Sequence, residues 1–99
     1  MKVVLETEHG SKVICDKNPF LLGRSPECNY KLEGDKASRK HAQIVVEGEQ
    51  SYIEDLNSSN GTFVNMVQIK GKVEIFKGDL LRFADVRMKV VAGSEKKLH

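Results

Sequence analysis

Two short stretches of this chain combine basic, hydroxyl-bearing and small residues in a way that suits the binding of an anion. Residues 23–25, Gly-Arg-Ser, follow an apolar run, and residues 38–41, Ser-Arg-Lys-His, precede another. The planar fork of Arg24 matches the geometry of a phosphate or a carboxylate. The hydroxyl of Ser38 and the backbone N–H groups of a tight turn are further donors to an anion. The first stretch by itself more often marks a solvated arginine at the end of a strand, whereas the second stretch suits an anion.

The same residue types could serve catalysis or metal binding, and their spacing argues against both. Ser38 and His41 could be a nucleophile and its base, but no Gly-x-Ser-x-Gly elbow and no oxyanion loop accompany them. We expect His41 instead to brace its loop through a ring hydrogen bond. Cys15 and Cys28 lie outside any Cys-x-x-Cys spacing and form no metal-ligand pattern with the histidines, so we expect buried, reduced thiols. The sequence predicts a protein that is not an enzyme and that needs no metal or cofactor.

Residues 55–62, Asp-Leu-Asn-Ser-Ser-Asn-Gly-Thr, are the stretch richest in small polar side chains. An Asn-Gly pair between two strands is a strong signal for a plain hairpin turn. Four consecutive small polar residues nevertheless exceed what a two-residue turn needs. The amide of Asn60 can clamp a peptide backbone at both its N–H and its C=O, and Gly61 allows a positive φ. A binding loop is the more specific interpretation, and we expect the nearby acidic residues, Asp55 included, to be solvated.

These polar stretches need a rigid scaffold, and the rest of the chain indicates an all-β one. No segment carries apolar residues at helical spacing over about ten positions. Short β-rich runs broken by Gly, Asn, Asp or Pro recur instead, which is typical of a sandwich or a barrel. The predicted strands cover residues 3–7, 12–15, 20–22, 42–47, 51–56, 63–65, 67–69, 73–76, 80–83 and 86–90. The predicted loops are residues 25–38 and 57–61, and we expect one domain at 1–92 followed by a flexible polar tail at 93–99.

The composition of the chain argues against several classes of protein. Hydrophobic residues make up 39% and charged residues 30% of the 99 residues, a balance typical of a soluble globular domain. No apolar run approaches the roughly 18 residues of a membrane helix, and residues 1–6 lack a signal-peptide core. We therefore expect a cytoplasmic protein without membrane contact. The net charge is only +2 and aromatic residues are 6%, which argues against nucleic-acid binding.

Taken in order, four stretches resemble the motifs of the forkhead-associated (FHA) domain family. They are residues 22–25 (Leu-Gly-Arg-Ser), 38–41 (Ser-Arg-Lys-His), 54–65 (Glu-Asp-Leu-Asn-Ser-Ser-Asn-Gly-Thr-Phe-Val-Asn) and 77–83 (Lys-Gly-Asp-Leu-Leu-Arg-Phe). Their order and spacing extend the resemblance over residues 3–91. The resemblance implies an all-β sandwich of two sheets, with about eleven short, mostly antiparallel strands and binding loops at one end. It also implies a module that binds phosphothreonine in a partner protein, for signalling or assembly.

The resemblance also implies roles for individual residues. The positions that it implies for phosphate binding are Arg24, Ser38, Arg39 and Ser59. It implies that Asn60 holds the peptide backbone and that the loops are supported by Gly23, His41 and Gly61. Among these positions Arg39 is a variable one beside the serine, and Ser59 stands where the family often has threonine.

Two departures from the family pattern lie outside these positions. Met66 and Ala84 stand where glycine is common, and we expect the turn at Met66 to be altered. Two rival hypotheses remain: a module of the same fold that binds unphosphorylated protein as a scaffold or in oligomers, and a small barrel that binds nucleic acid. We expect the isolated domain to be monomeric. We expect no self-ligand, because the only threonines, Thr7 and Thr62, lie in a strand and in the Asn-Gly motif.

Overall fold

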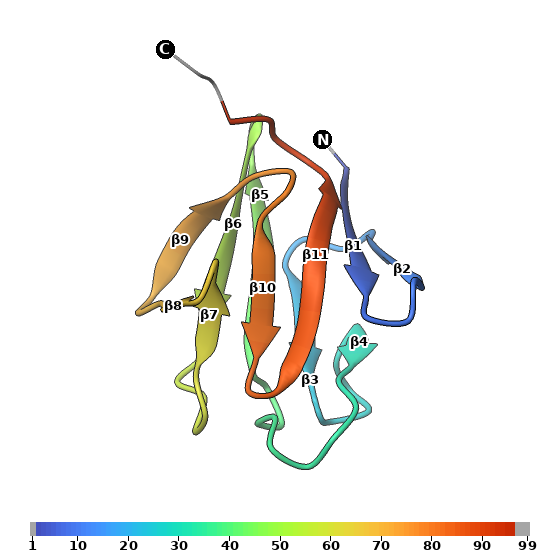
Figure 1. The fold of residues 1–99 in the computed structure, drawn as a ribbon, viewed down its shortest axis with the longest axis vertical. Coiled ribbons are helices and arrows are strands. Elements are labelled where there is room, and N and C mark those ends of the chain that lie inside the picture. The colour runs from blue at the N-terminus through green and yellow to red at the C-terminus, as the bar shows by residue number, and fades with distance from the viewer. Residues whose placement is uncertain (1, 97–99) are drawn as a thin grey trace.

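The computed structural model describes residues 2–96, which form eleven strands in two sheets and contain no helix (Figure 1). The strands are β1 (Val3–Thr7), β2 (Lys12–Cys15), β3 (Phe20–Gly23), β4 (Tyr30–Lys31), β5 (Ala42–Glu47), β6 (Gln50–Asp55), β7 (Thr62–Val64), β8 (Val67–Gln68), β9 (Lys72–Ile75), β10 (Leu80–Phe83) and β11 (Val86–Ala92). The predicted all-β sandwich is confirmed, and every strand except β4 overlaps a predicted run.

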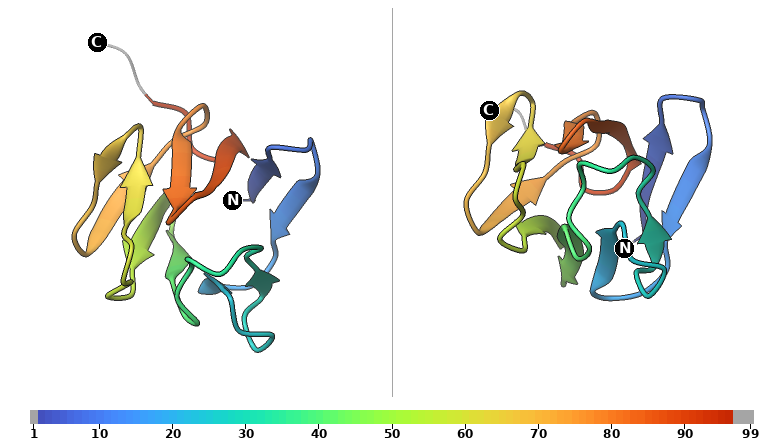
Figure 2. Two further views of the ribbon diagram at one scale, coloured as in Figure 1. Left: turned by 60° about the horizontal axis from the view of Figure 1, so that its bottom comes forward. Right: turned by 90° about the horizontal axis from the view of Figure 1, so that it is seen from below.

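The strands are divided between two sheets that pack against each other (Figure 2). One sheet has six strands in the order β2-β1-β11-β10-β7-β8, and the other has five in the order β4-β3-β5-β6-β9. Neighbouring strands run antiparallel except β3 and β4, which are parallel. Because β1 pairs with β11, the first and last strands of the chain are joined in the same sheet. Completing that sheet therefore requires contacts across nearly the whole sequence.

Alternation of apolar and polar positions along the strands places one face of each sheet in the core. In β1, Val3 and Leu5 are fully buried, and the positions between and after them are partly exposed. The same alternation buries Ile44 of β5 and Ile53 of β6 in the facing sheet. Complete burial of one such side chain contributes about 1.5–3 kcal/mol. The packed core between the sheets thus makes the sandwich a rigid scaffold for the loops at its ends.

The short strand β4 lies inside the segment predicted to be a loop, so this part of the prediction is wrong. Only two residues of β4 pair with β3, which is too few to leave an alternating pattern in the sequence. The next residue, Leu32, is 1% exposed, and its N–H donates to the carbonyl oxygen of Gly23 over 2.8 Å. Burial of Leu32 therefore holds this segment against β3.

The two departures from the family pattern fall on tight turns with a left-handed backbone. Asn65 and Met66, between the paired residues Val64 and Val67, have φ of 50° and 72°. Two positive φ values are those of a type I′ hairpin turn, so this turn has that geometry with methionine at its second position. Ala84, between β10 and β11, has φ of 58°. A left-handed residue with a Cβ costs roughly 1–2 kcal/mol, so both turns carry strain.

The start of β1 and the end of β11 lie at the same end of the sandwich (Figure 1). Beyond β11, the hydroxyl of Ser94 donates to the carbonyl oxygen of Glu49 over 2.9 Å, and the carbonyl oxygen of Ser94 accepts the N–H of Lys77 over 2.7 Å. Ser94, two residues past the predicted end of the domain at residue 92, is thus still hydrogen-bonded to it. Residues 97–99 of the predicted tail lie outside the described residues. Within residues 2–96, no helix is long and apolar enough to cross a membrane.

Candidate functional site

Three connections between strands meet at the end of the sandwich opposite the start of β1 (Figure 1; Figure 2, right). They are residues 24–29 between β3 and β4, residues 32–41 between β4 and β5, and residues 56–61 between β6 and β7. All the site residues suggested by the sequence lie in these connections or, for Gly23, at the adjoining end of β3. The fold therefore gathers segments that are distant in the sequence at one end of the molecule.

Arg24 is attached to the connection that carries Ser38. Its backbone N–H donates to the carbonyl oxygen of Ser38 over 2.9 Å. The N–H of Ser25 donates to the carbonyl oxygen of Arg39 over 3.1 Å. The side-chain Nε–H of Arg24 donates to the carbonyl oxygen of Ala37 over 3.1 Å. The two terminal nitrogens of this exposed side chain have no hydrogen bond or ion pair within residues 2–96. The structure thus brings Arg24 and Ser38 together, as an anion site requires.

Gly23 allows the two connections to approach each other closely. A Cβ at Gly23 would lie 2.0 Å from the carbonyl oxygen of Arg39 and 2.8 Å from the Sγ of Cys28. Cys28 itself donates its thiol hydrogen to the same carbonyl oxygen over 3.1 Å. Any larger residue at Gly23 would therefore displace the backbone of Arg39. Cys28 is a supporting residue that sequence reasoning missed, because nothing local in the chain links it to Arg39.

Both cysteines are free thiols, but neither is as deeply buried as the sequence suggested. Burial raises the pKa of the Cys15 thiol to about 12, and the negative charge of Asp16 adds to the shift. Burial also raises the pKa of Cys28, although a backbone hydrogen bond and the charge of Lys40 oppose it. Both thiols are therefore protonated at neutral pH. Within the described part of the chain, no group of three or more His, Cys, Asp or Glu side chains is placed to hold a metal ion.

His41 is buried and joins two of the three connections. The N–H of Ser38 donates to its Nδ1 over 3.0 Å, and its Nε2 lies 2.9 Å from the carbonyl oxygen of Gly61. Because Nδ1 accepts a hydrogen bond, the neutral ring carries its hydrogen on Nε2 and donates it to Gly61. The ring also meets Phe83 edge to face, with 6.0 Å between the ring centroids. His41 thereby sets the distance between the connection that carries Ser38 and the one that carries Asn60.

Two further hydrogen bonds attach the β6–β7 connection to the β4–β5 connection. The N–H of Ser59 donates to Oγ of Ser38 over 3.0 Å, and Nδ2 of Asn60 donates to the carbonyl oxygen of Lys36 over 2.7 Å. Ser38 keeps its own hydroxyl hydrogen for donation, and Asn60 keeps one N–H and its Oδ1. The side chains of Ser59 and Asn60 are exposed. These bonds orient polar side chains and leave other donors and acceptors available.

Asp55 organises the β6–β7 connection and is not the solvated residue that the sequence suggested. Its carboxylate accepts the N–H of Ser58 over 3.2 Å, the hydroxyl of Ser58 over 2.6 Å and the hydroxyl of Thr62 over 2.7 Å. Ser58 in turn accepts the N–H of Gly61 over 3.1 Å. Burial by itself would raise the pKa of Asp55, but the hydrogen bonds from Ser58 and Thr62 outweigh it and lower the pKa. The Asp-x-x-Ser spacing of residues 55–58 was the available signal, since such side chains often bond nearby backbone groups.

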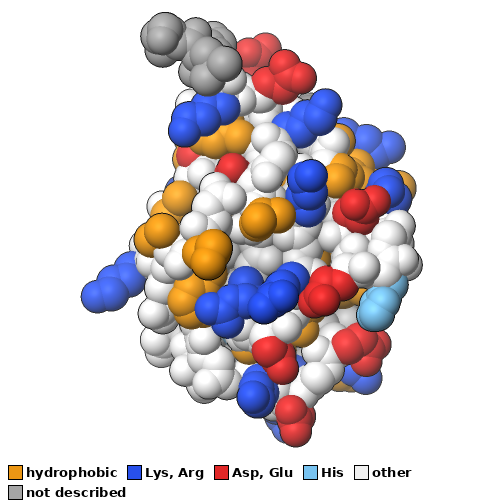
Figure 3. Space-filling model, in the orientation of Figure 1, with side chains coloured by type: hydrophobic (Ala, Val, Ile, Leu, Met, Phe, Trp, Pro, Cys, Tyr) orange, Lys and Arg blue, Asp and Glu red, His pale blue; other side chains and the backbone are white. Residues whose placement is uncertain are grey.

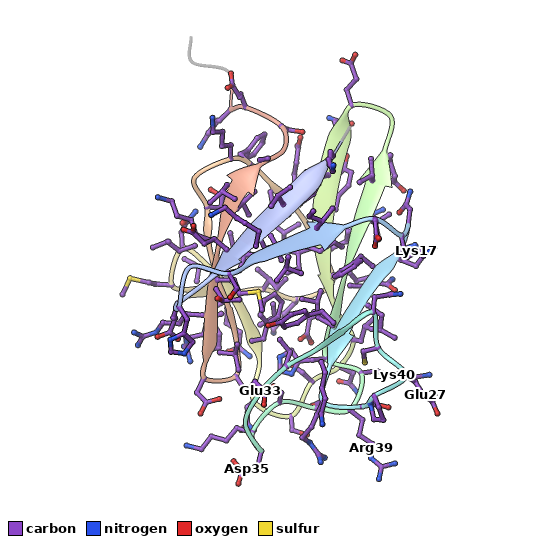
Figure 4. All side chains as sticks on the ribbon, turned by 90° about the vertical axis from the view of Figure 1, so that its right-hand side faces the viewer. Lys17, Glu27, Glu33, Asp35, Arg39 and Lys40 are labelled. Carbon is purple, nitrogen blue, oxygen red and sulfur yellow. The ribbon has the colours of Figure 1, made fainter. Side chains whose placement is uncertain are left out.

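Charged side chains surround this end of the molecule (Figure 4). Arg39 and Lys40 extend outward on one side of the β4–β5 connection, and Glu33 and Asp35 extend outward on the other. The carbonyl oxygen of Arg39 takes part in the contacts with β3, whereas its side chain is exposed and makes no hydrogen bond to residues 2–96. Arg39 is thus an exposed cation beside the hydrogen-bonded loops.

The fold and the site together define a class of protein: a β-sandwich that presents binding groups on the loops at one end. A guanidinium, a hydroxyl and a side-chain amide stand there on connected loops. The family model of the FHA domain matches residues 20–84, and the chain belongs to this family.

Similar curated proteins come from mycobacteria. The FHA domain-containing protein FhaB of Mycobacterium tuberculosis is 32% identical over 73 residues, which are 74% of this chain and 47% of that protein. The glycogen accumulation regulator GarA of Mycolicibacterium smegmatis is 30% identical over 84 residues, which are 85% of this chain and 52% of that protein. The chain therefore spans about half the length of these relatives.

Two solved structures extend the similarity to three dimensions. A structure from a study of phosphothreonine-dependent FHA domain interactions has a TM-score of 0.84 at 25% identity, over 99% of this chain and 100% of that one. The structure of Mycobacterium tuberculosis EmbR in complex with a low-affinity phosphopeptide has a TM-score of 0.88 at 27% identity, over 97% of this chain and 26% of that one.

Proposed function

We propose that this chain is a phosphopeptide-binding module that recognises phosphothreonine in a partner protein. It acts as a monomeric domain in the cytoplasm and has no catalytic activity of its own. The observation that carries the proposal is the attachment of the Arg24 guanidinium to the loop of Ser38, with its terminal nitrogens left without a partner in residues 2–96. The similarity to EmbR with its phosphopeptide and to the domain studied for phosphothreonine-dependent interactions supports it.

In this proposal each exposed group of the site contacts a different part of the ligand. A phosphothreonine carries a charge of about −1.5 to −2 and three strong acceptor oxygens. The terminal nitrogens of Arg24 and the hydroxyl hydrogen of Ser38 donate to these oxygens, and Arg39 and Ser59 add contacts at the edge of the site. Asn60 holds the peptide backbone with its Oδ1 and its second N–H.

Hydrogen-bond energies set the expected strength of binding. Each hydrogen bond to a charged group contributes about 1.5–3 kcal/mol, while association itself costs about 4 kcal/mol or more. Two or three such bonds, with the backbone contacts of Asn60 and packing of the peptide, give an affinity in the micromolar range. Gly23, His41 and Gly61 act on the loops and not on the ligand. They lower the entropy lost on binding, because the loops are ordered before the peptide arrives.

The test is an oriented library of phosphothreonine peptides beside its dephosphorylated twin, followed by calorimetry with the best binder. We expect Arg24→Ala to weaken binding of the phosphorylated peptide at least tenfold, about 1.4 kcal/mol, with the fold intact. Lys17→Ala, at an exposed lysine between β2 and β3, is the matched control and should keep the parent affinity. Equal affinity of Arg24→Ala and the parent would refute the proposal. Equal capture by the two libraries would favour a scaffold module that binds unphosphorylated protein.

A further inference from the structure

A groove on the outer face of the six-stranded sheet lies away from the three connections of the site. It has a volume of about 610 Å³ and is lined by β10, β11, the end of β1 and Met66 in the β7–β8 turn. A second hollow of about 310 Å³ shares Thr7, Glu8, Arg87 and Met88 with it. The second hollow reaches Gly34 in the β4–β5 connection. The groove therefore borders a second hollow that reaches the end of the molecule that carries the candidate site.

Met66 at the edge of this groove contributes little to the stability of the isolated domain. Its side chain is 89% exposed and its φ is 72°, so it buries little apolar surface in a conformation that disfavours a Cβ. The neighbouring Asn65 holds the turn in place: its Nδ2 donates to Oδ1 of Asp79 and its Oδ1 accepts the N–H of Leu80, both over 3.0 Å. An apolar side chain is thus presented on a fixed turn beside the start of β10.

Apolar and basic side chains lie side by side on this face (Figure 3). Leu80 lines the groove together with Met66 and is 53% exposed. The charged residues that line the groove are Arg82, Arg87, Lys89, Glu6 and Glu8. Glu6 already pairs with Lys12, which lies outside the groove. The remaining charges give the groove an excess of positive charge next to its apolar edge.

Arg82 is held in place by contacts that leave its charge unneutralised. Its guanidinium lies over the ring of Phe63, 3.8 Å from the ring centroid, and its Nη1 donates to the carbonyl oxygen of Ala84 over 2.6 Å. Neither contact is an ion pair, and none of the ion pairs within residues 2–96 includes Arg82, Arg87 or Lys89. A partner that brings carboxylates to this face would therefore meet an Arg82 guanidinium that is already positioned, with Arg87 and Lys89 lining the same groove.

We propose that this groove is a second docking surface, and that its occupant is a segment of a partner protein in which carboxylates flank apolar side chains. The apolar side chains contact Met66 and Leu80, and the carboxylates pair with Arg82, Arg87 and Lys89. Charge complementarity and the exposed apolar edge of Met66 and Leu80 favour this occupant. One partner can then place a phosphothreonine in the loops and this segment on the sheet. Simultaneous binding of the phosphothreonine and of this segment rests on the proposed function. Binding of the segment to the docking surface does not.

The test uses a synthetic peptide without phosphate, in which Asp and Glu alternate with Leu and Phe. A peptide with Lys in place of every acid is its control. In an NMR titration of the isotope-labelled chain, the acidic peptide should shift amide signals of β10, β11 and the β7–β8 turn. It should bind at least tenfold more tightly than the basic peptide, and Lys89→Glu should remove that difference, whereas Lys70→Glu, outside the groove, should preserve it.

Substitutions at the apolar edge give a second readout of the same docking surface. Leu80→Ser and Met66→Gly should each weaken binding of the acidic peptide fivefold or more. Ile14→Ser should not, because Ile14 is similarly exposed, at 48%, but lies on β2 outside the groove. Thermal unfolding of each variant shows whether the fold is kept.

Several results would overturn the docking surface. They are equal binding of the two peptides, shifts confined to another face, and no shift at millimolar peptide. A dimer in sedimentation that Leu80→Ser converts to a monomer would also overturn it, because a second copy of the chain would then be the occupant. Since the probe carries no phosphate, these results are independent of those from the phosphothreonine library. A failure of the docking surface can therefore be told apart from a failure of the proposed function.

Discussion

Replacing His41 by alanine tests how the loops of the site are held together. The substitution removes a ring that is 0% exposed, together with its hydrogen bonds to the N–H of Ser38 and the carbonyl oxygen of Gly61. Each buried polar group left without a partner costs about 1–3 kcal/mol, and the cavity left by the ring adds to this. We expect a loss of about 3–5 kcal/mol in the free energy of unfolding. That is a large part of the roughly 5–15 kcal/mol that stabilises a typical domain.

Thermal and urea unfolding measure this loss, and peptide binding reports its effect on the site. For a domain of this length, each kcal/mol lowers Tm by about 4–8 °C, so the decrease should be at least about 12 °C. Affinity for a phosphothreonine peptide should also fall at a temperature where the variant is still folded, because Ser38 and Asn60 lose their fixed separation. His41→Leu fills a similar volume without either hydrogen bond. Its Tm should lie between those of the parent and His41→Ala.

Two outcomes would refute this reasoning. A His41→Ala variant that melts at the temperature of the parent would show that the ring does not brace the loops. A His41→Leu variant as stable as the parent would show that packing alone accounts for the buried ring, and that its two hydrogen bonds add no net stability.

Asn60→Ala should weaken phosphorylated and unphosphorylated peptides alike, since its amide contacts the peptide backbone; calorimetry that finds a loss only with phosphorylated peptide would contradict this role. Met66→Gly should raise the free energy of unfolding by about 0.5–1 kcal/mol in urea, because it relieves a φ of 72°, whereas Met66→Ala keeps a Cβ and should not. Asp55→Asn should lower the free energy of unfolding by about 1–3 kcal/mol at neutral pH. Hydrogen bonding keeps the folded pKa of Asp55 below its ordinary 3.8, so its stabilising contribution is complete above that pH and is lost as the pH falls through the folded pKa. A difference between Asp55→Asn and the parent that grew in acid would be inconsistent with this sign.

The strands and turns could be predicted because their signals are local. In β11 the buried Met88 and Val90 alternate with the exposed Arg87 and Lys89, and that period of two is visible in four consecutive residues. The turn between β7 and β8 follows in the same way from the short β-rich runs on either side of it, although Asn65, which the sequence placed in a strand, is its first residue. The sequence does not show the type I′ geometry of this turn, because glycine is the usual residue at the position that Met66 occupies.

Other features of the site could not be predicted because they depend on distant residues. β4 exists because Leu32 is buried and its N–H bonds to Gly23. The side chain of Asn60 is oriented by the carbonyl oxygen of Lys36, and the thiol of Cys28 donates to the carbonyl oxygen of Arg39. A carbonyl oxygen carries no residue-specific signature, so neither contact leaves a pattern in the sequence.

By itself the sequence determined an all-β fold and the ordered motifs of the FHA family, because alternation, turn residues and motif order are properties of consecutive positions. The resemblance to that family then implied the sandwich. Only the tertiary structure decided that Arg24 meets the loop of Ser38, and that Met66 borders a groove with excess positive charge. These contacts join segments that are distant in the sequence. Which residues come together depends on strand pairing and on close packing, as in the approach of Arg39 to Gly23, where a single added methyl group would not fit.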